Sequence, residues 1–386
     1  MEGEAFKINA IGKIDKNLLA TGVIQEDGLR FYNVKEAPFT IYGLLPCDQG
    51  EPFRRMPSEI AQNIGEKIWK LHTHTAGGRV RFRTNSNKIA IRAFMPDTNL
   101  MPHMPFLGSS GFDLYEVSES SNTEHIEGEH DPPMVNWTYR GSYISPTNRC
   151  GCFEAAVQLE SRGMRDLLIN FPLYDNVDEL WVGLEADALL LEGGKYLARD
   201  PVIYYGSSIT QGGCASRPGN AYQAIIGRNL NCDYINLGFS GSAKGEQGMA
   251  DYIAGLPMSV FVMDYDHNAA TEELDRTHEA FFMTVRERHP DVPIVLVSMT
   301  DPPGTPQKAE MIMRHWEIIR RTYENALRRG DKLVQLIDGR TIFQCCSALD
   351  VNADSCTVDG VHPNDLGFAC MAKVIGEAVR QALQCC

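Results

Sequence analysis

The chain has 386 residues, of which 43% are hydrophobic and 22% are charged, and its formal net charge is −14. This length exceeds that of one typical domain, so we expect two globular domains. The excess of acidic residues argues against a nucleic-acid partner, because that binding depends on clustered Lys and Arg side chains that neutralise phosphates. A neutral or cationic small ligand or a glycan fits this charge better.

The N-terminal residues 1–17, MEGEAFKINAIGKIDKN, interleave charged and apolar side chains and contain no apolar core of a signal peptide or membrane anchor. No other stretch is long and apolar enough to span a bilayer. The eleven cysteines include the adjacent pairs Cys345-Cys346 and Cys385-Cys386 but no Cys-x-x-Cys, which indicates free thiols in a reducing compartment. We therefore expect a cytoplasmic protein.

Short alternating apolar and polar runs fill residues 36–190 and are separated by Gly, Asn, Ser and Pro. Examples are GRVRFRTNSNKIAIRAFMP, GFDLYEV, NWTYRGSYI, DLLINFPL and ELWVGLEADALLL. This period of two with regular turn signals predicts an antiparallel, jelly-roll-like β-sandwich. Within it, residues 53–70 are expected to form a short helix or a crossing loop.

The period changes after residues 192–200, EGGKYLARD, so we place a domain boundary near Lys195, with domains at 1–195 and 196–386. Strands are predicted at PVIYYG, CDYINLG, SVFVMDY, PIVLVSM and KLVQLID. Helices are predicted at NAYQAIIGRNL, EELDRTHEAFFMTVRERH, PQKAEMIMRHWEIIRRTYENALRRG and DLGFACMAKVIGEAVRQALQ. Strands that alternate with helices indicate an α/β domain, with a parallel sheet covered on both faces.

The first strand of this second domain ends at a corner, YYGSSITQGG. Ligands of open parallel sheets bind at the carboxyl ends of the strands. A serine at this corner, at the start of the next helix, exposes its hydroxyl as a nucleophile would. Ser208 is therefore a candidate nucleophile, although Gly-Ser-Ser alone more often marks an ordinary turn.

A serine nucleophile needs a base, and the base needs a group that orients it. TVDGVHPNDLGF places Asp359 three residues before His362, just ahead of the last helix. One loop could then present a carboxylate to one ring nitrogen and turn the other nitrogen towards Ser208. The alternative is a simple Asx-type turn with a solvated histidine.

Two further strand ends could supply donors for an oxyanion. INLGFSGSA offers a glycine-rich turn at Gly238 and Gly241, and VFVMDYDHNAA ends its strand near Asn268. Each residue alone has a plainer interpretation, a turn glycine for Gly241 and a helix cap for Asn268.

Taken together, these pieces resemble the SGNH (GDSL-like) hydrolases over roughly residues 200–384. The resemblance implies a flavodoxin-like domain with Ser208 as nucleophile, His362 as general base and Asp359 as the orienting acid. It also implies oxyanion donors at the Ser208 N–H, the Gly241 N–H and the Asn268 side chain. Two positions depart from the family: Ser207 replaces the usual Asp, and Tyr265-Asp266-His267-Asn268-Ala269 replaces the usual Gly-x-Asn-Asp.

The first domain contains Gly111-Phe112-Asp113-Leu114-Tyr115, which is similar to the Gly-x-Asp-Leu-Tyr module that precedes some SGNH domains. The two-domain arrangement resembles bacterial carbohydrate esterases that remove acetyl groups from plant glycans, and in particular carbohydrate esterase family 17, which acts on 2-O-acetylated mannan oligosaccharides. We expect Asp113 and Tyr115 to fix the sandwich to itself or to the second domain.

Aromatic faces and polar groups bind sugars, so candidates for substrate contact are Trp137, His103, Phe106 and Trp316. Each of them could equally be a packing residue. We expect no metal site, since His72 and His74 look like one side of a strand and His125 and His130 like a solvated acidic loop, and we expect no other cofactor.

These features predict a serine esterase whose partner is an acetylated oligosaccharide, with no nucleic acid or membrane partner and a homo-oligomer as an open possibility. Activity should fall at acidic pH, because His362 must be neutral to accept a proton. Two rivals remain: an acyltransferase that uses the same three residues, and a non-catalytic glycan-binding protein in which Ser207 marks a decayed site.

Overall fold

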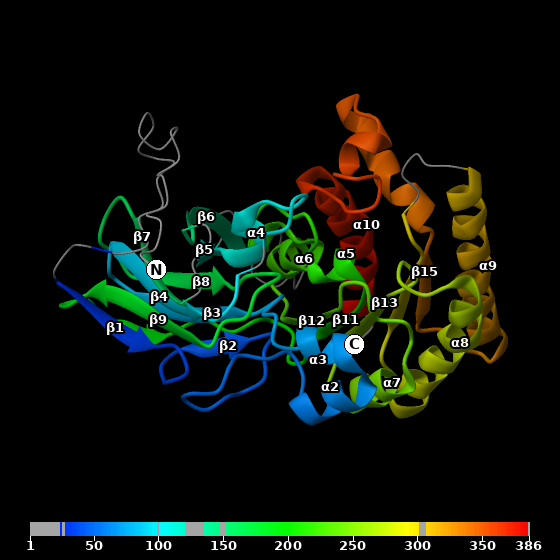
Figure 1. The fold of residues 1–386 in the computed structure, drawn as a ribbon, viewed down its shortest axis with the longest axis horizontal. Coiled ribbons are helices and arrows are strands. Elements are labelled where there is room, and N and C mark those ends of the chain that lie inside the picture. The colour runs from blue at the N-terminus through cyan, green and yellow to red at the C-terminus, as the bar shows by residue number, and fades with distance from the viewer. Residues whose placement is uncertain are drawn as a thin grey trace, which may run out of the picture.

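The structure is a computed structural model that describes residues 24, 28–98, 100–119, 135–146, 151–300 and 306–384. Strands of two antiparallel sheets lie on one side of the molecule and a parallel sheet with its helices lies on the other (Figure 1). His125 and His130 lie outside the described residues. In the described part of the chain, no helix combines the length and the apolar character needed to cross a membrane.

The first half of the chain forms two antiparallel sheets. One has the order β1-β9-β4-β7, and the other has the order β10-β3-β8-β5-β6 with β2 paired to β3. Their strands are β1 (Leu29–Asn33), β2 (Thr40–Tyr42), β3 (Arg79–Thr84), β4 (Lys88–Met95), β5 (Phe112–Glu119), β6 (Val135–Tyr143), β7 (Gly151–Gln158), β8 (Arg165–Asn170), β9 (Glu179–Glu185) and β10 (Leu190–Glu192).

Alternate side chains of both sheets meet in one apolar core. Ile89 and Ile91 on β4 and Val182 on β9 face Val80 on β3 and Ile169 on β8. The alternation in the sequence predicted this arrangement, and the antiparallel sandwich is confirmed.

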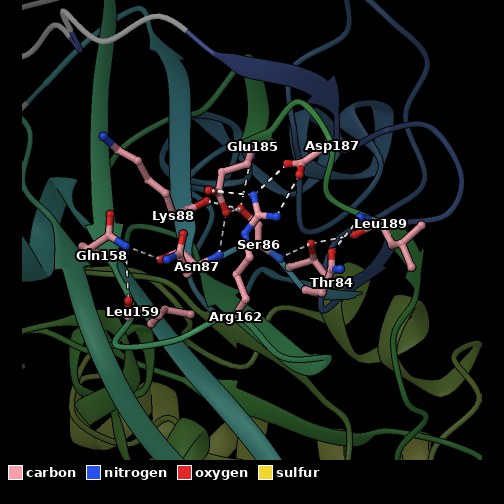
Figure 2. Close-up of polar contacts among 11 residues, drawn as sticks. Thr84, Ser86, Asn87, Lys88, Gln158, Leu159, Arg162, Glu185, Asp187 and Leu189 are labelled. Carbon is pink, nitrogen blue, oxygen red and sulfur yellow. Dashed lines mark hydrogen bonds and ion pairs between the residues drawn. The ribbon is translucent and has the colours of Figure 1, made fainter.

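Turns of the sandwich are linked through Arg162, in the segment between β7 and β8 (Figure 2). Its guanidinium donates to both carboxylate oxygens of Asp187, at 2.8 and 2.7 Å, and pairs with Glu185 at 2.9 Å. Glu185 in turn accepts hydrogen bonds from the Ser86 hydroxyl and the Asn87 N–H. These bonds connect the β3–β4 turn, the β7–β8 segment and the turn after β9.

The segment predicted as a short helix or loop at 53–70 forms two short helices, α2 (Ser58–Ile64) and α3 (Glu66–Leu71). They leave the sandwich and lie beside α7 (Gln247–Ala254) of the second half (Figure 1). Met56, Ala61 and Ile68 are buried in the core on that side of the parallel sheet. An early part of the sequence therefore completes the hydrophobic core of the later part.

The parallel sheet has the order β12-β11-β13-β14-β15. Its strands are β11 (Val202–Gly206), β12 (Tyr234–Gly238), β13 (Val260–Asp264), β14 (Ile294–Val297) and β15 (Val334–Ile337), so all five predicted strands are confirmed. In chain order this is the 2-1-3-4-5 arrangement of flavodoxin-like folds, whose order reverses between β11 and β13. Ligand sites of such sheets lie at the carboxyl ends of strands beside that reversal.

Helices cover both faces of the parallel sheet (Figure 1). The core on one face includes side chains of α6 (Tyr222–Leu230) and α10 (Asp365–Leu383), and the core on the other face includes α7, α8 (Thr271–Arg288) and α9 (Pro306–Arg328). Consecutive strand residues alternate between the two cores, as Tyr204 and Tyr205 do. The predicted α/β class is therefore confirmed.

Several short elements had no counterpart in the sequence-based prediction. They are α4 (Phe106–Ser110), α5 (Ser208–Gln211), α7, and the 3-10 helices η2 (Pro218–Asn220), η3 (Gly339–Leu349) and η4 (Ala353–Cys356). Most of them are too short to show a clear helical period.

Candidate active site

Ser208 is the first residue of helix α5, directly after strand β11. The residue before it, Ser207, is fully buried and caps this helix, because its hydroxyl accepts a hydrogen bond from the Ile209 N–H at 3.1 Å. The serine that stands in place of the family's Asp thus still supplies an oxygen acceptor for the turn.

Glycines let α5 begin tightly against the sheet. A Cβ atom on Gly206 would lie 2.0 Å from Thr210 Oγ1, and one on Gly238 would lie 2.2 Å from the backbone N of Gln211. Any side chain at either position would push α5, and Ser208 with it, away from the strand ends. Strands β11 and β12 therefore both end in glycine, because α5 packs too closely against them to leave room for a side chain.

Ser208, His362 and Asp359 form a continuous hydrogen-bonded chain. Ser208 Oγ is 2.9 Å from His362 Nε2, and His362 Nδ1 is 2.7 Å from Asp359 Oδ2. A carboxylate can only accept, so Nδ1 carries the proton, and Nε2 is left as the acceptor for the serine hydroxyl. These are the relations required between a serine, its base and the orienting acid.

The carboxyl group of Asp359 is stabilised in its ionised form. Burial opposes ionisation, but hydrogen bonds from the backbone N–H and ring of His362 and from the Val361 N–H outweigh it, and they lower the pKa of Asp359 to about 2. Asp359 is therefore a carboxylate across the ordinary pH range.

The loop that carries Asp359 and His362 is closed by backbone contacts. Thr357 and Pro363 form an antiparallel bridge, and the Val358 N–H donates to the His362 carbonyl at 2.9 Å. Asn364 then caps α10 by accepting hydrogen bonds from the backbone of Leu366 and Gly367. These bonds fix the position of the imidazole relative to the helix.

The two other expected oxyanion donors lie together after β12 and β13. Gly241 has a φ of 60°, and the space where its Cβ would lie is open. The Asn268 amide donates to the carbonyls of Phe239, at 3.2 Å, and Ser242, so it holds the turn that contains Gly241. The roles of Gly241 and Asn268 as oxyanion donors stay predictions.

The sequence did not single out three polar residues that support the catalytic turn. The Tyr174 hydroxyl donates to the Ser208 carbonyl at 3.0 Å, and Gln211 accepts from the Ser240 N–H at 3.0 Å. Arg55 is buried and donates to the carbonyls of Asn236, at 3.1 Å, and Gly238, at 2.5 Å. Arg55 and Tyr174 lie in the first half of the chain, and the residues around them form no motif that would mark them as part of this site.

Burial lowers the pKa of Arg55 to about 9. Its guanidinium lies over the Phe239 ring, 4.4 Å from the centroid, and also donates to the Leu71 carbonyl at 2.7 Å. One side chain from the first half of the sequence thus joins α3 to the end of β12.

The Gly-x-Asp-Leu-Tyr motif contacts the second half directly. Asp113 is fully buried and accepts hydrogen bonds from Arg217, at 2.9 Å, and from the Gly219 N–H, at 2.8 Å. Tyr115 bonds to the same Arg217. As expected, Asp113 and Tyr115 fix the sandwich to the second half of the molecule.

The loop that receives Asp113 also reaches the last helix. Ser216 donates through its N–H, at 2.9 Å, and through its hydroxyl to Asp365, the first residue of α10. The Asn220 amide donates to the same carboxylate at 2.8 Å. The sandwich is thereby connected, through residues 216–220, to the helix that follows His362.

The candidate sugar contacts are dispersed. The His103 ring lies 5.4 Å from the His362 ring, which places it beside the proposed base. Trp137 stacks on Tyr196, Trp316 lies under Arg340, and Phe106 begins helix α4. Within the described ranges, the last three form no hydrogen bond or ring contact with Ser208, and their substrate roles stay predictions.

His72 and His74 do not share a strand. His72 follows helix α3 and bonds to Ser58, whereas His74 faces the Gln211 amide at 3.2 Å, so the expected strand at this point is wrong. The reason is that α3 continues to Leu71, so His72 lies in the turn that follows it and His74 forms only an isolated bridge with Asn176. Their side chains have separate partners.

Two other groups of side chains could bind a metal ion within the described residues. His103, Cys214 and His362 form one, and Cys345, Cys346 and Cys370 form the other, each with ligand atoms within 4.8 Å of one another. The first group includes the histidine that faces Ser208, so an ion there would compete with the serine for Nε2.

Residues 199–380 match the GDSL-like Lipase/Acylhydrolase family, and residues 29–190 match the family described as the N-terminus of Esterase_SGNH_hydro-type, known by the motif GxDLY. No curated protein sequence matches the chain significantly.

The fold is similar to that of several solved structures. A GDSL-like lipase from Bacteroides ovatus ATCC 8483 is 28% identical, with a TM-score of 0.79 over 92% of this chain and 98% of that one. A salicylyl-acyltransferase from a tetracycline biosynthetic pathway is 20% identical, with a TM-score of 0.67 over 93% and 98%. A family two carbohydrate esterase from Cellvibrio japonicus is 12% identical, with a TM-score of 0.55 over 92% and 98%.

Proposed function

Because the chain belongs to the GDSL-like lipase/acylhydrolase family and is an esterase, we propose that it removes O-acetyl groups from a plant-type oligosaccharide with Ser208 as the nucleophile. The observation that carries this proposal is the Ser208–His362–Asp359 chain, with distances of 2.9 and 2.7 Å.

The first step of the proposed reaction is acylation. His362 Nε2 accepts the Ser208 proton while Oγ attacks the ester carbonyl, and Asp359 stabilises the imidazolium that forms. The oxyanion is bound by the Ser208 N–H, the Gly241 N–H and the Asn268 side chain. For Asn268 this requires that its amide release one of its two carbonyl partners.

The intermediate then collapses as the sugar oxygen takes the proton from His362 and leaves as an alcohol. Water, deprotonated by His362, attacks the acyl-serine. The bond between the acyl carbon and Ser208 Oγ breaks, Oγ takes the proton back from His362, and acetate is released. The same imidazole accepts and then donates a proton in each step. The reaction therefore stops if His362 is already protonated before Ser208 attacks.

The proposed substrate is a 2-O-acetylated mannan oligosaccharide, hydrolysed in the bacterial cytoplasm. Three points support it: the acidic net charge fits a neutral glycan, the sandwich contributes His103 beside His362, and carbohydrate esterases share the fold. The described cysteines are free thiols, which suits a reducing compartment.

The test is acetate release from an acetylated mannan oligosaccharide by the wild type and by Ser208→Ala. We expect the variant to lose at least roughly 10³-fold in kcat while keeping the wild-type melting temperature. Equal rates in the two proteins would refute Ser208 as nucleophile. Release from an aryl acetate but not from the glycan would retain the serine esterase and reject the substrate.

Acyl transfer is the second candidate function, since a salicylyl-acyltransferase shares the fold over nearly the whole chain. The same acyl-serine can be attacked by an alcohol in place of water. Adding a competing sugar alcohol distinguishes the two: a new ester product that replaces free acetate indicates transfer.

A further inference from the structure

Four cysteine side chains from three segments converge in the core next to helix α10. Cys345 and Cys346 lie in η3, Cys356 ends η4, and Cys370 lies on α10. Cys346 Sγ is 2.7 Å from Cys356 Sγ and 3.2 Å from Cys370 Sγ. All four are free thiols, and the sulfur atoms of Cys345, Cys346 and Cys370 lie within 4.8 Å of one another.

Apolar packing alone does not account for this convergence. Carbon atoms in a protein core pack at about 3.5–4.0 Å, whereas Cys346 Sγ lies within hydrogen-bonding distance of two other thiol sulfur atoms. Thiols are also weak hydrogen-bond donors and acceptors, so they attract one another little. A ligand that binds several sulfur atoms at once would explain why they meet.

We propose that Cys345, Cys346, Cys356 and Cys370 bind a thiophilic divalent metal ion of the zinc type. Zinc takes four thiolates in a tetrahedron with Zn–S bonds of about 2.3 Å, which separates the sulfur atoms by about 3.8 Å. The observed separations of 2.7 and 3.2 Å are shorter than that value, so the sulfur atoms would move slightly apart to bind the ion. Small side-chain rotations would therefore complete the site.

The surroundings fit such an ion. Cys346, Cys356 and Cys370 are buried, whereas Cys345 is only partly buried and offers a route of entry. Binding must release thiol protons to solvent, which makes the metal affinity fall as the pH is lowered.

The proposed ion would also secure the loop that carries Asp359 and His362. Cys356 precedes this loop, Cys370 lies on the helix that follows it, and the Asn364 N–H donates to the Cys356 carbonyl at 3.0 Å. Binding both cysteines to one ion would fasten the two ends of the loop. This consequence for activity rests on the proposed function, but the metal site itself does not.

Cobalt substitution of the full-length chain tests the site directly. We expect one Co²⁺ per chain, with sulfur-to-cobalt charge-transfer absorption and the intense visible bands of a tetrahedral thiolate complex. Cys346→Ser should abolish these bands. Cys232→Ser, which removes a buried thiol outside the cluster, should leave them unchanged.

The group formed by His103, Cys214 and His362 is the competing site, and Cys214→Ser separates the two. Retention of the charge-transfer bands in this variant supports the cysteine cluster, whereas their loss assigns the ion to the active site and overturns the proposal. Background metal content and no charge-transfer bands in the folded wild type would also overturn it.

A second measurement covers the case in which Cys346→Ser fails to fold. In the wild type, zinc should protect Cys345 from alkylation by a maleimide, and a chelator should remove that protection and lower the melting temperature. Equal labelling with and without zinc contradicts the site. Ester hydrolysis is measured separately, so a protein that binds the metal but has no esterase activity would reject only the proposed function.

Discussion

Asp113 on strand β5 and Arg217 in the loop before η2 form an ion pair between the two halves of the molecule, with Nη1 2.9 Å from Oδ2. The carboxylate also accepts hydrogen bonds from the Gly219 N–H and from the Asn170 amide. Asp113 is fully buried, so each of its partners compensates part of the cost of burying the charge.

Replacing Asp113 by Asn should therefore lower both stability and activity. The change leaves Arg217 without its carboxylate, and we expect the free energy of unfolding to fall by about 2–4 kcal/mol. The loop at 216–220 that bonds to Asp365 should shift, which lowers kcat more than it raises KM. Denaturant unfolding and ester hydrolysis measure the two effects.

Arg162→Gln is the matched control, because it removes two ion pairs within the sandwich, to Glu185 and Asp187 (Figure 2). Arg162 is 44% exposed, and such pairs contribute less than about 1 kcal/mol. A loss in Asp113→Asn no larger than in Arg162→Gln would show that the contact between the halves has no special importance.

Gly213→Ala should reduce turnover without unfolding the protein. A Cβ at this position would lie 2.8 Å from the Tyr174 hydroxyl, 2.9 Å from the Ser208 carbonyl and 3.3 Å from His362 Cδ2. These groups position the proposed nucleophile and base, and a shift of about 1 Å costs roughly 10²-fold in rate.

The control for Gly213→Ala is Gly255→Ala at the end of α7, where a Cβ meets only atoms at 3.4 Å and beyond. Its kcat should equal that of the wild type. An unchanged kcat in Gly213→Ala, measured beside this control, would show that the close packing around Ser208 tolerates displacement.

The pH dependence of hydrolysis should show a single acid limb. Asp359 has a pKa of about 2 and remains ionised, so loss of activity on acidification reports protonation of His362. We expect kcat/KM to fall as the pH is lowered, and Asp359→Asn to lose about 10³–10⁴-fold in kcat at neutral pH. A profile that does not fall on acidification would contradict His362 as the base.

Asp264 predicts an opposite trend for stability. This buried residue accepts hydrogen bonds from Tyr222 and Thr210, yet burial outweighs them and raises the pKa of Asp264 to about 7. The folded protein therefore binds a proton that the unfolded chain releases near pH 4, and stability falls as the pH rises from about 4 to 7, by up to about 1.4 kcal/mol per pH unit.

Asp264→Asn tests this assignment, because the amide has the shape of the protonated acid and does not titrate. The unfolding free energy of the variant should depend less steeply on pH in this window, as measured by urea unfolding at several pH values. If the pH dependence of the unfolding free energy is unchanged in the variant, another group causes it, such as the neighbouring buried Asp266.

The sequence predicted the features that depend on local pattern. Alternation in runs such as KIAIRAFM specified the sandwich, and the apolar stretch PVIYYG specified the strand that ends near Ser208. Asp359 and His362 could be paired because their spacing lets one loop present both side chains.

Contacts between distant segments could not be predicted in this way. Arg55 meets the Gly238 carbonyl across 183 residues of sequence, and no local signal distinguishes it from a surface arginine. Helix α3 ends at Leu71, and the few residues between it and the His74 bridge are too short to show a period, so His72 and His74 were wrongly predicted to share a strand. The cysteine cluster lacks a Cys-x-x-Cys spacing because its members come from three segments that only the fold brings together.

The position of α2, α3 and Arg55 has a consequence for the order in which the chain is synthesised. These segments leave the ribosome long before β12, whose terminal carbonyls Arg55 binds. Until then, Met56, Ala61 and Ile68 lack the apolar side chains of the second half with which they are buried. A fragment beginning near Lys195 would lack these three side chains and would expose the apolar surface of the second half that they cover.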